Sequence, residues 1–320
     1  MDHRARAERS DGARQSRAER SDGARQSIVG SVLGASAALS YGVTVVIGRE
    51  LAKAHLPPAD ALGLRFGIAG LALVALLAIR RRPLLAEPGE RVRVLLFGAV
   101  GYAVESALFY AGLARGTAAA VTLLFYSYPA VVTVADLVIT RRRPPAQLIF
   151  ALALAGSGAG AIAAGSGHVD ITSAGIVFSL AAAASFAVYL IAGDRLLHRT
   201  DSMRIAAGTA MGASASLLTF AVIAGEVRVP ADRWWQLLVY GGATASAFAF
   251  MFAALRRLGS QRTSVLLTLE AVFAIALAAI FLDESLGAVQ ALGGAAVLAA
   301  AVIIGLTPLR PPVEAAAEPP

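Results

Sequence analysis

The sequence has no cysteine and only four histidines among its 320 residues. Without cysteine the chain has no disulfide, no thiolate nucleophile and no cysteine-based metal site. The histidines are scattered, one at position 3 and three near the ends of apolar segments, which excludes a histidine cluster. Charged residues make up only 15% of the chain, against about 25% in a typical soluble domain. We therefore expect no metal site and no cofactor.

The sequence is correspondingly rich in apolar residues. They make up 57% of the sequence, and the mean hydropathy is +0.68. The run from Thr263 to Leu282 contains a single ionisable residue, Glu270. Twenty helical residues span about 30 Å, the thickness of the hydrocarbon core of a bilayer. This run predicts a transmembrane helix, with the lipid bilayer as its partner.

Ten runs of this kind follow one another along the chain. They lie at about 28–48, 59–79, 92–114, 117–139, 147–165, 171–192, 203–225, 236–255, 263–282 and 287–306. Short connections with turn signals such as Pro57-Pro58 and Pro144-Pro145 separate them. The predicted fold class is an all-α polytopic membrane protein with ten transmembrane helices.

The two halves of the chain resemble each other. A shift of 143 positions places Gly116 on Gly259, Leu123 on Leu266 and Leu124 on Leu267. We interpret 28–165 and 171–306 as two copies of a five-helix repeat. Because five is odd, the second copy enters the membrane in the opposite sense. Inverted repeats of this kind place a substrate site near the midplane where the halves meet.

The two ends of the chain differ from the rest in composition. Residues 6–16, RAERSDGARQS, recur without change at 17–27. This tandem duplication of 11 residues is charged and has almost no large apolar side chain to bury. We predict that 1–27 forms a disordered basic tail and that 308–320, rich in Pro, Ala and Glu, forms a disordered C-terminal tail.

The distribution of arginine predicts the orientation. With the N-terminus inside, the basic clusters Arg80–Arg82, Arg141–Arg143 and Arg256-Arg257 all face the cytoplasm, as the positive-inside rule requires. Both termini are then cytoplasmic, and the protein lies in the inner (cytoplasmic) membrane. Topology also explains the net charge of +7, so we expect no nucleic-acid partner. A homodimer is left open.

Several stretches resemble EamA-type transporters of the drug/metabolite transporter superfamily. They include Leu39–Gly42, Arg65-Phe66, 112–120 through Tyr128-Pro129, Leu269–Val272 and Asp283–Leu286. The resemblance covers about 28–306 and implies two five-helix repeats. The sequence departs from the family in two places. Ala271 stands where the family usually has proline, so a proline kink in this helix is not implied, and Thr140-Arg141 replaces an acidic residue.

Three ionisable residues lie inside predicted helices. Glu105 has Tyr102 and Phe109 on its helical face, an arrangement suited to an ammonium group or a proton. The alternative is a structural carboxyl, neutral or paired with Arg65. Arg65 itself can bind a substrate carboxylate with its planar fork. Glu270 is either a substrate or gating carboxyl or a hydrogen-bonded acid that pins its helix; it shares a face with Thr263, Leu267 and Ala274.

Polar residues add weaker candidates for substrate binding. Ser40 and Thr44 continue a stripe from Ser36, and Ser185 and Tyr189 occupy the matching face of the sixth helix. Such hydroxyls also bond to their own backbone or across helices. Asp136 is interpreted as an interfacial partner of Arg141–Arg143.

These features favour a secondary transporter. It would move small polar metabolites such as amino acids, by efflux, through alternating access of the two repeats. An integral membrane enzyme or a non-transporting scaffold is the alternative. The helices contain no catalytic constellation, however, and a scaffold has little use for costly buried charges.

Overall fold

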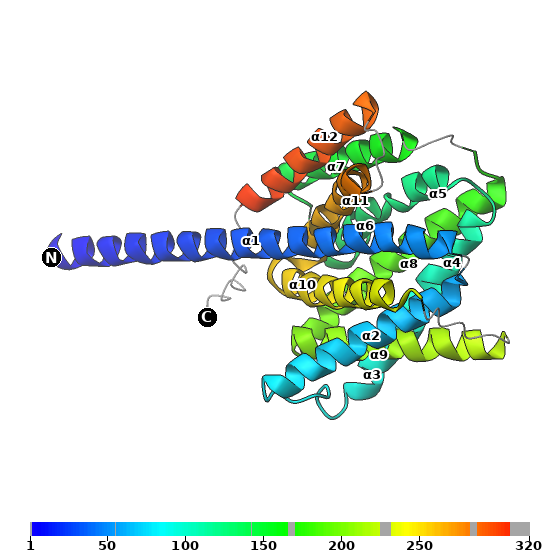
Figure 1. Ribbon diagram of the computed structural model, residues 1–320. Helices are drawn as coiled ribbons and strands as arrows, with labels where there is room; N and C mark the ends of the chain where they lie inside the picture. The colour runs from blue at the N-terminus through cyan, green and yellow to red at the C-terminus, as the bar shows by residue number, and fades with distance from the viewer. Residues whose placement is uncertain are drawn as a thin grey trace.

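The computed structural model is a bundle of helices. It describes residues 2–54, 56–141, 143–165, 170–224, 232–281 and 287–307, with side chains from residue 23 onward except that of Lys53. The helices are α1 (Asp2–Lys53), α2 (Pro58–Ile79), α3 (Arg91–Leu96), the π-helix η1 (Phe97–Tyr102), α4 (Ala103–Leu113), α5 (Ala118–Phe125), α6 (Tyr128–Thr140), α7 (Ala146–Gly165), α8 (Ser173–Leu197), α9 (Ser202–Ile223), α10 (Trp234–Leu267), α11 (Leu269–Phe281) and α12 (Ala288–Leu306) (Figure 1).

Nine helical segments among these described residues are long and apolar enough to cross a membrane. The π-helix joins α3 and α4 into one of them, 91–113, and α5 and α6 together form another, 118–140. Large apolar side chains such as Leu71, Val138 and Leu292 are exposed on the outside of the bundle. A soluble protein rarely exposes so many, whereas a bilayer covers them. The chain is a multi-pass membrane protein.

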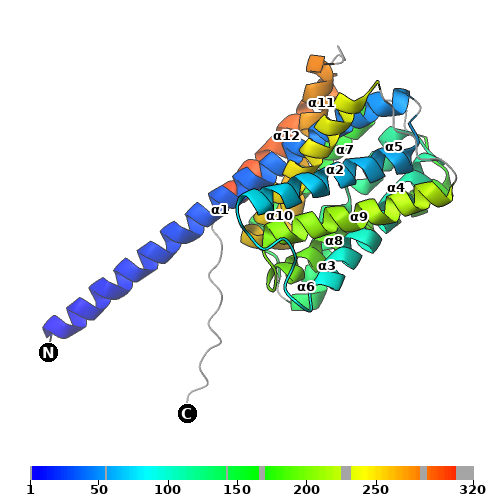
Figure 2. The ribbon, with the colours of Figure 1, turned by 60° about the horizontal axis from the view of Figure 1, so that its bottom comes forward.

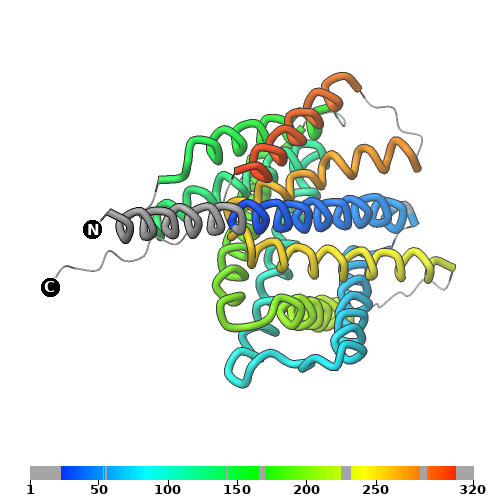
Figure 3. Tube along the Cα trace, turned by 90° about the vertical axis from the view of Figure 1, so that its left-hand side faces the viewer, coloured from blue at the N-terminus to red at the C-terminus, as the bar shows by residue number. Residues whose placement is uncertain are grey.

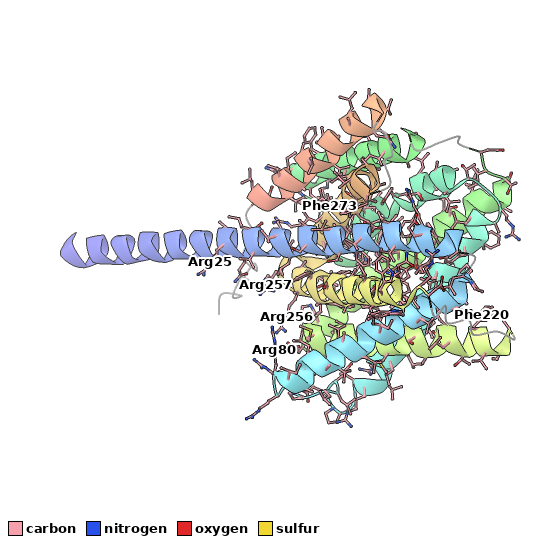
Figure 4. All side chains as sticks on the ribbon, in the orientation of Figure 1. Arg25, Arg80, Phe220, Arg256, Arg257 and Phe273 are labelled. Atoms are coloured by element: carbon pink, nitrogen blue, oxygen red, sulfur yellow. The ribbon has the colours of Figure 1, made fainter. Side chains whose placement is uncertain are left out.

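The two ends of the bundle differ in charge. Arg25, Arg80, Arg256 and Arg257 lie at one end, which we call the basic end (Figure 4). Trp234 and Trp235, both exposed, begin α10 at the other end, which we call the tryptophan end. Indoles prefer the membrane interface, so the two ends are suited to the two surfaces of one bilayer.

The two halves run in opposite senses. Helix α1 runs from the basic end to the tryptophan end, and α8, its counterpart by the shift of 143, runs back (Figure 1). Each half reaches into the other, because α1 packs against α10 and α11, while α8 packs against α4, α5 and α6 (Figure 3). The pairs α2 with α9 and α7 with α12 join equivalent helices (Figure 2).

Glycines permit the closest helix crossings. A Cβ on Gly158 of α7 would lie 2.5 Å from the carbonyl oxygen of Gly293 in α12, and the converse distance is the same. Gly63 meets Leu218 and Gly67 meets Ser214, so this pair packs α2 on α9 as its spacing predicts.

Not every predicted glycine contact is present. The pair Gly156/Gly160 has the small-xxx-small spacing that is typical of close helix packing, but Gly156 has open space beside it, and only Leu123 lies near Gly160. The helix crossing is made by Gly158 instead. Small-xxx-small spacing does not single out Gly158, because the residues four positions away from it are Leu154 and Ile162.

Residues 2–27, for which the sequence predicts a disordered tail, continue α1 as helix in the structure. The physical reason is that both copies of the duplication are rich in Ala, Arg, Glu and Gln, which favour helix. The apolar segment after residue 27 supplies the nucleus, and extending a helix costs far less than starting one. The predicted C-terminal tail, 308–320, lies outside the described residues.

Candidate functional site

The fourth predicted span is interrupted in the middle. Helix α5 ends at Phe125, and α6 begins at Tyr128. Pro129 has no N–H to donate to the carbonyl of Phe125 four residues earlier, so the helix cannot continue unbroken. Every residue from Thr122 to Ser127 keeps some accessible surface.

The ninth span is interrupted as well. Helix α10 turns at Gly259, whose φ of 74° is in the left-handed region that favours glycine, and a short helical segment, Ser260–Leu267, follows. This half-helix ends at Thr268, before α11 begins. The hydroxyl of Thr268 donates to the carbonyl of Val265 at 2.7 Å, a bond that competes with the helix ladder.

The two interruptions are equivalent in the repeats. The shift of 143 places Phe125 on Thr268 and Ser127 on Glu270. We expected one unbroken helix over 263–282, and the structure corrects this. The predicted face that joined Glu270 to Thr263 and Leu267 is therefore divided between two helices. Proline is not needed for the second break, since Ala271 and Val272 follow it.

Arg65 is buried, with 6% of its surface exposed. Its Nε donates to the hydroxyl of Thr244 at 2.7 Å, and Nη1 donates to that of Tyr240 at 3.3 Å. The guanidinium also lies 4.9 Å from the ring centroids of Phe66 and Tyr240. These contacts satisfy the desolvated cation through a set of polar and aromatic neighbours rather than a carboxylate.

The two glutamates lie near Arg65 without touching it. Glu105 is buried and accepts a hydrogen bond from the hydroxyl of Ser106 at 3.2 Å. Glu270 keeps part of its surface accessible, and no described residue holds its carboxylate by a hydrogen bond or ion pair. All three groups are within range of electrostatic interaction with one another. The direct pair between Arg65 and Glu105 that the sequence left open is not formed.

Tyrosines surround these three groups. All seven in the chain lie within electrostatic range of Arg65, Glu105 or Glu270, namely Tyr41, Tyr102, Tyr110, Tyr126, Tyr128, Tyr189 and Tyr240. They come from both halves, and Tyr126 and Tyr128 flank the break between α5 and α6. Tyrosine suits such a place, because its ring packs against apolar groups while its hydroxyl can bind a polar one.

Tyr189 has a buried hydroxyl without a partner among the described residues. Its side chain is stacked on Phe97 at 4.4 Å and lies 6.1 Å from Tyr102, measured between ring centroids. The hydroxyl of Ser127, at the break in the fourth span, is also buried and unpaired within the described part of the chain. A buried polar group without a partner costs free energy, so both hydroxyls are candidates for contact with a ligand.

The other predicted residues divide into two groups. Tyr102 packs edge-on against Phe66 at 4.5 Å, and Phe109 lies 5.3 Å from Phe125, so both belong to the aromatic surroundings of the glutamates. The hydroxyls of Ser40 and Thr44 instead donate to carbonyls of their own helix.

Two further residues complete the comparison with the sequence. Ser185 is half-buried one turn before Tyr189 on α8. Asp136 accepts a hydrogen bond from Nε2 of Gln261 at 2.8 Å, rather than pairing with Arg141 or Arg143, the two described arginines of the predicted cluster.

The sequence predictions missed several residues at this site. Tyr41, Tyr126, Tyr128, Tyr240 and Thr244 were not among the candidates, although the duplication contained a usable signal. Aligned by the shift of 143, Glu270 falls opposite Ser127, between Tyr126 and Tyr128.

A hollow of about 340 Å³ at the basic end, lined by Arg25 and Arg257 with neighbours from α1, is separate from these residues (Figure 4).

Glu270 therefore lies at one of two helix breaks that are equivalent in the repeats, and Arg65 and Glu105 interact with it electrostatically. The model of the EamA-like transporter family matches residues 28–164 and 173–306, which together are most of the chain. The chain belongs to the EamA-like transporter family. Its membership agrees with two repeats and with the resemblance inferred from the sequence.

Known proteins extend the comparison. The threonine/homoserine exporter RhtA of Salmonella typhimurium is 32% identical over 151 residues, 45% of this chain and 49% of that protein. RhtA of Escherichia coli K12 is 30% identical over 146 residues, and the uncharacterized transporter YcbK of Bacillus subtilis is 30% identical over 128. The chain thus spans about half the length of the curated relatives it matches. A solved crystal structure, 17% identical, has a TM-score of 0.74 over 86% of this chain and 96% of its own, and so shares the EamA-like fold.

Proposed function

We propose that this protein is a secondary transporter that exports small amino acids of the threonine and homoserine kind across the cytoplasmic membrane by alternating access. One observation carries the proposal. Arg65, Glu105 and Glu270 lie within electrostatic range of one another, beside helices broken at equivalent positions of two inverted repeats. Broken helices at corresponding positions are the feature that marks substrate sites in inverted-repeat transporters. The exporter RhtA supplies the substrate class.

The residues suit a zwitterion. An α-amino acid carries one carboxylate and one ammonium group, and this site offers one guanidinium and two carboxyls. Nη2 of Arg65 makes no hydrogen bond to the described residues and is available to a substrate carboxylate. Glu270, accessible and unpaired there, is available to the ammonium group. The hydroxyls of Tyr189 and Ser127 would then contact the polar side chain of the substrate.

Ten membrane spans complete the proposed architecture. The half-helix Ser260–Leu267 and α11 together form the ninth span, as α5 and α6 form the fourth. The basic end faces the cytoplasm, because the positive-inside rule assigns the arginine-rich loops to that side. Transport would then require the two repeats to close one end of the bundle while opening the other.

Flux through proteoliposomes tests this proposal. The purified chain would be reconstituted with labelled threonine, homoserine, a cationic amino acid and a sugar in separate experiments. We expect flux of threonine or homoserine above protein-free vesicles, with no flux of the sugar. Glu270→Gln should lower that flux at least tenfold, since removing an interaction with a charged group costs about 1.5–3 kcal/mol. Equal flux by Glu270→Gln, or flux of the sugar alone, would contradict the assignment.

A further inference from the structure

Among the described residues, the broken helices pack against each other at the basic end. Near the basic end, α6 packs against α10, and hydrogen bonds join α6 to the half-helix Ser260–Leu267. The hydroxyl of Tyr128 donates to the carbonyl of Ser264 at 3.2 Å, and Gln261 donates to Asp136 at 2.8 Å. Toward the tryptophan end, the counterpart helices α5 and α11 make no comparable contact.

A third bond holds the beginning of the half-helix. The backbone N–H of Ser260 donates to Oδ2 of Asp194 on α8 at 3.3 Å, directly after the turn at Gly259. A carboxylate at this position satisfies an N–H that has no partner within the helix and interacts favourably with the helix dipole. Asp136 and Asp194 thus hold the same half-helix from two different helices.

We propose that Asp136 and Asp194 are positioning residues that latch the half-helix Ser260–Leu267 against α6 and α8, and so keep the basic end of the transporter closed until the latch is released. This inference rests on the proposed alternating access. It assigns a role to two carboxylates that lie outside the group of Arg65, Glu105 and Glu270.

The counterpart positions show that the latch is one-sided. By the shift of 143, Asp194 and Ser260 correspond to Leu51 and Thr117, and Asp136 corresponds to Ala279. The remaining residues of these bonds also lack polar counterparts. Gln261 corresponds to Ala118, Tyr128 to Ala271 and Ser264 to Val121. No side-chain bond of this kind can therefore form between the counterparts at the tryptophan end. At the tryptophan end the start of α5 is held differently, through Thr117, whose hydroxyl accepts from the N–H of Asp170 at 3.3 Å. The bonds from Asp136 and Asp194 are therefore specific to the basic end.

Burial agrees with this asymmetry. Every residue from Val265 to Leu269 is buried, whereas the counterparts Thr122 to Tyr126 all keep accessible surface. The pair Thr122 and Val265 illustrates the difference, because the two are related by the shift of 143 and Val265 is only 1% exposed. If the repeats exchanged conformations, Val265 would become accessible and Thr122 would become buried.

The absence of cysteine makes this exchange measurable. Thr122→Cys and Val265→Cys would each be introduced alone, and their rates of reaction with N-ethylmaleimide measured on the full chain in proteoliposomes without substrate. In the otherwise unaltered protein we expect the cysteine at 122 to react faster. Adding Asp136→Ala and Asp194→Ala should raise the rate at 265 and lower that at 122, so that the ratio of the two rates changes by about a hundredfold, since each of the two hydrogen bonds to a charged group is worth about tenfold in the equilibrium between the two conformations.

Two control variants make the test specific. Asp136→Asn retains an oxygen that accepts from Gln261, so it should leave both rates near those of the unaltered protein. Glu87→Gln removes a carboxylate at the same end that pairs with Arg204 and does not touch the half-helix, and it should also change neither rate. A rise at 265 without a fall at 122 would mean local loosening and would overturn the latch, as would unchanged rates in the double variant.

Failure of the latch and failure of the proposed function are distinguishable. Amino-acid flux with unchanged cysteine rates would reject the latch and leave the transporter assignment intact. Rates that shift as expected in a protein that moves none of the tested amino acids would reject the substrate class and support the latch.

Discussion

The relation between Arg65 and Glu105 gives the sharpest prediction. The sequence left open a buried ion pair, and breaking such a pair costs about 3–5 kcal/mol because the remaining charge is left unpaired. The structure instead gives Arg65 the hydroxyls of Thr244 and Tyr240 as partners and gives Glu105 the hydroxyl of Ser106. Their stabilities should therefore respond independently to substitution.

The magnitudes follow from these contacts. Arg65→Gln loses charge-assisted hydrogen bonds and two ring contacts, which should lower the free energy of unfolding by about 2–4 kcal/mol. Glu105→Gln still accepts from Ser106, so its stability should change by less than about 1 kcal/mol. The coupling energy of the double variant should stay below about 1 kcal/mol, as for residues that share no partner.

Unfolding of the four proteins in mixed micelles, with threonine flux measured on the same samples, is the appropriate assay. Transport by Glu105→Gln should fall sharply while its stability is retained. Recovery of both stability and flux in the double variant, with a coupling energy of about 3 kcal/mol, would refute the reasoning and restore the ion pair.

Three further predictions concern packing, ligand contact and topology. Gly158→Ala should destabilise the protein by about 1–3 kcal/mol through overpacking, whereas Gly156→Ala should be neutral or stabilising by up to about 1 kcal/mol; thermal unfolding compares them. Tyr189→Phe should raise the KM for export several-fold without loss of stability, because its hydroxyl has no protein partner among the described residues. In intact cells an impermeant maleimide should label Asp232→Cys and not Arg82→Cys; the reverse pattern would invert the proposed orientation.

Some of the candidate residues lie together in the structure, and the sequence can express the reason for choosing them. An ionisable residue in a long apolar run is costly in a membrane, so Arg65, Glu105 and Glu270 could be recognised from hydropathy alone. Tyr102 lies near Glu105 as helical spacing indicated, and Tyr189, chosen only for its face of the sixth helix, also lies within electrostatic range of Glu105. For Ser40 and Thr44 the sequence could not decide between a structural role and ligand binding, because a hydroxyl in a helix can bond either to its own backbone or to a ligand. In the structure both bond to their own helix.

The break in the ninth span could be predicted from the sequence only in part. The position of this break could be inferred from the duplication. Pro129 interrupts the equivalent fourth span, and the shift of 143 places Pro129 on Val272. Without a proline there, however, the break depends on the turn at Gly259 and on the hydroxyl of Thr268, which bonds to Val265. Packing against α6 and α8 favours these local conformations.

The sequence by itself determined that this chain is an all-helical membrane protein, that its halves are copies of one unit, and that three ionisable residues lie within its apolar runs. Hydropathy, duplication and the cost of a charge in hydrocarbon are properties of the order of residues, and they need no coordinates. Only the tertiary structure decided the partners. Arg65 bonds to Thr244 and Tyr240 rather than to Glu105, and Asp136 bonds to Gln261 rather than to the arginines that follow it, because each joins helices whose relative rotation no sequence pattern specifies.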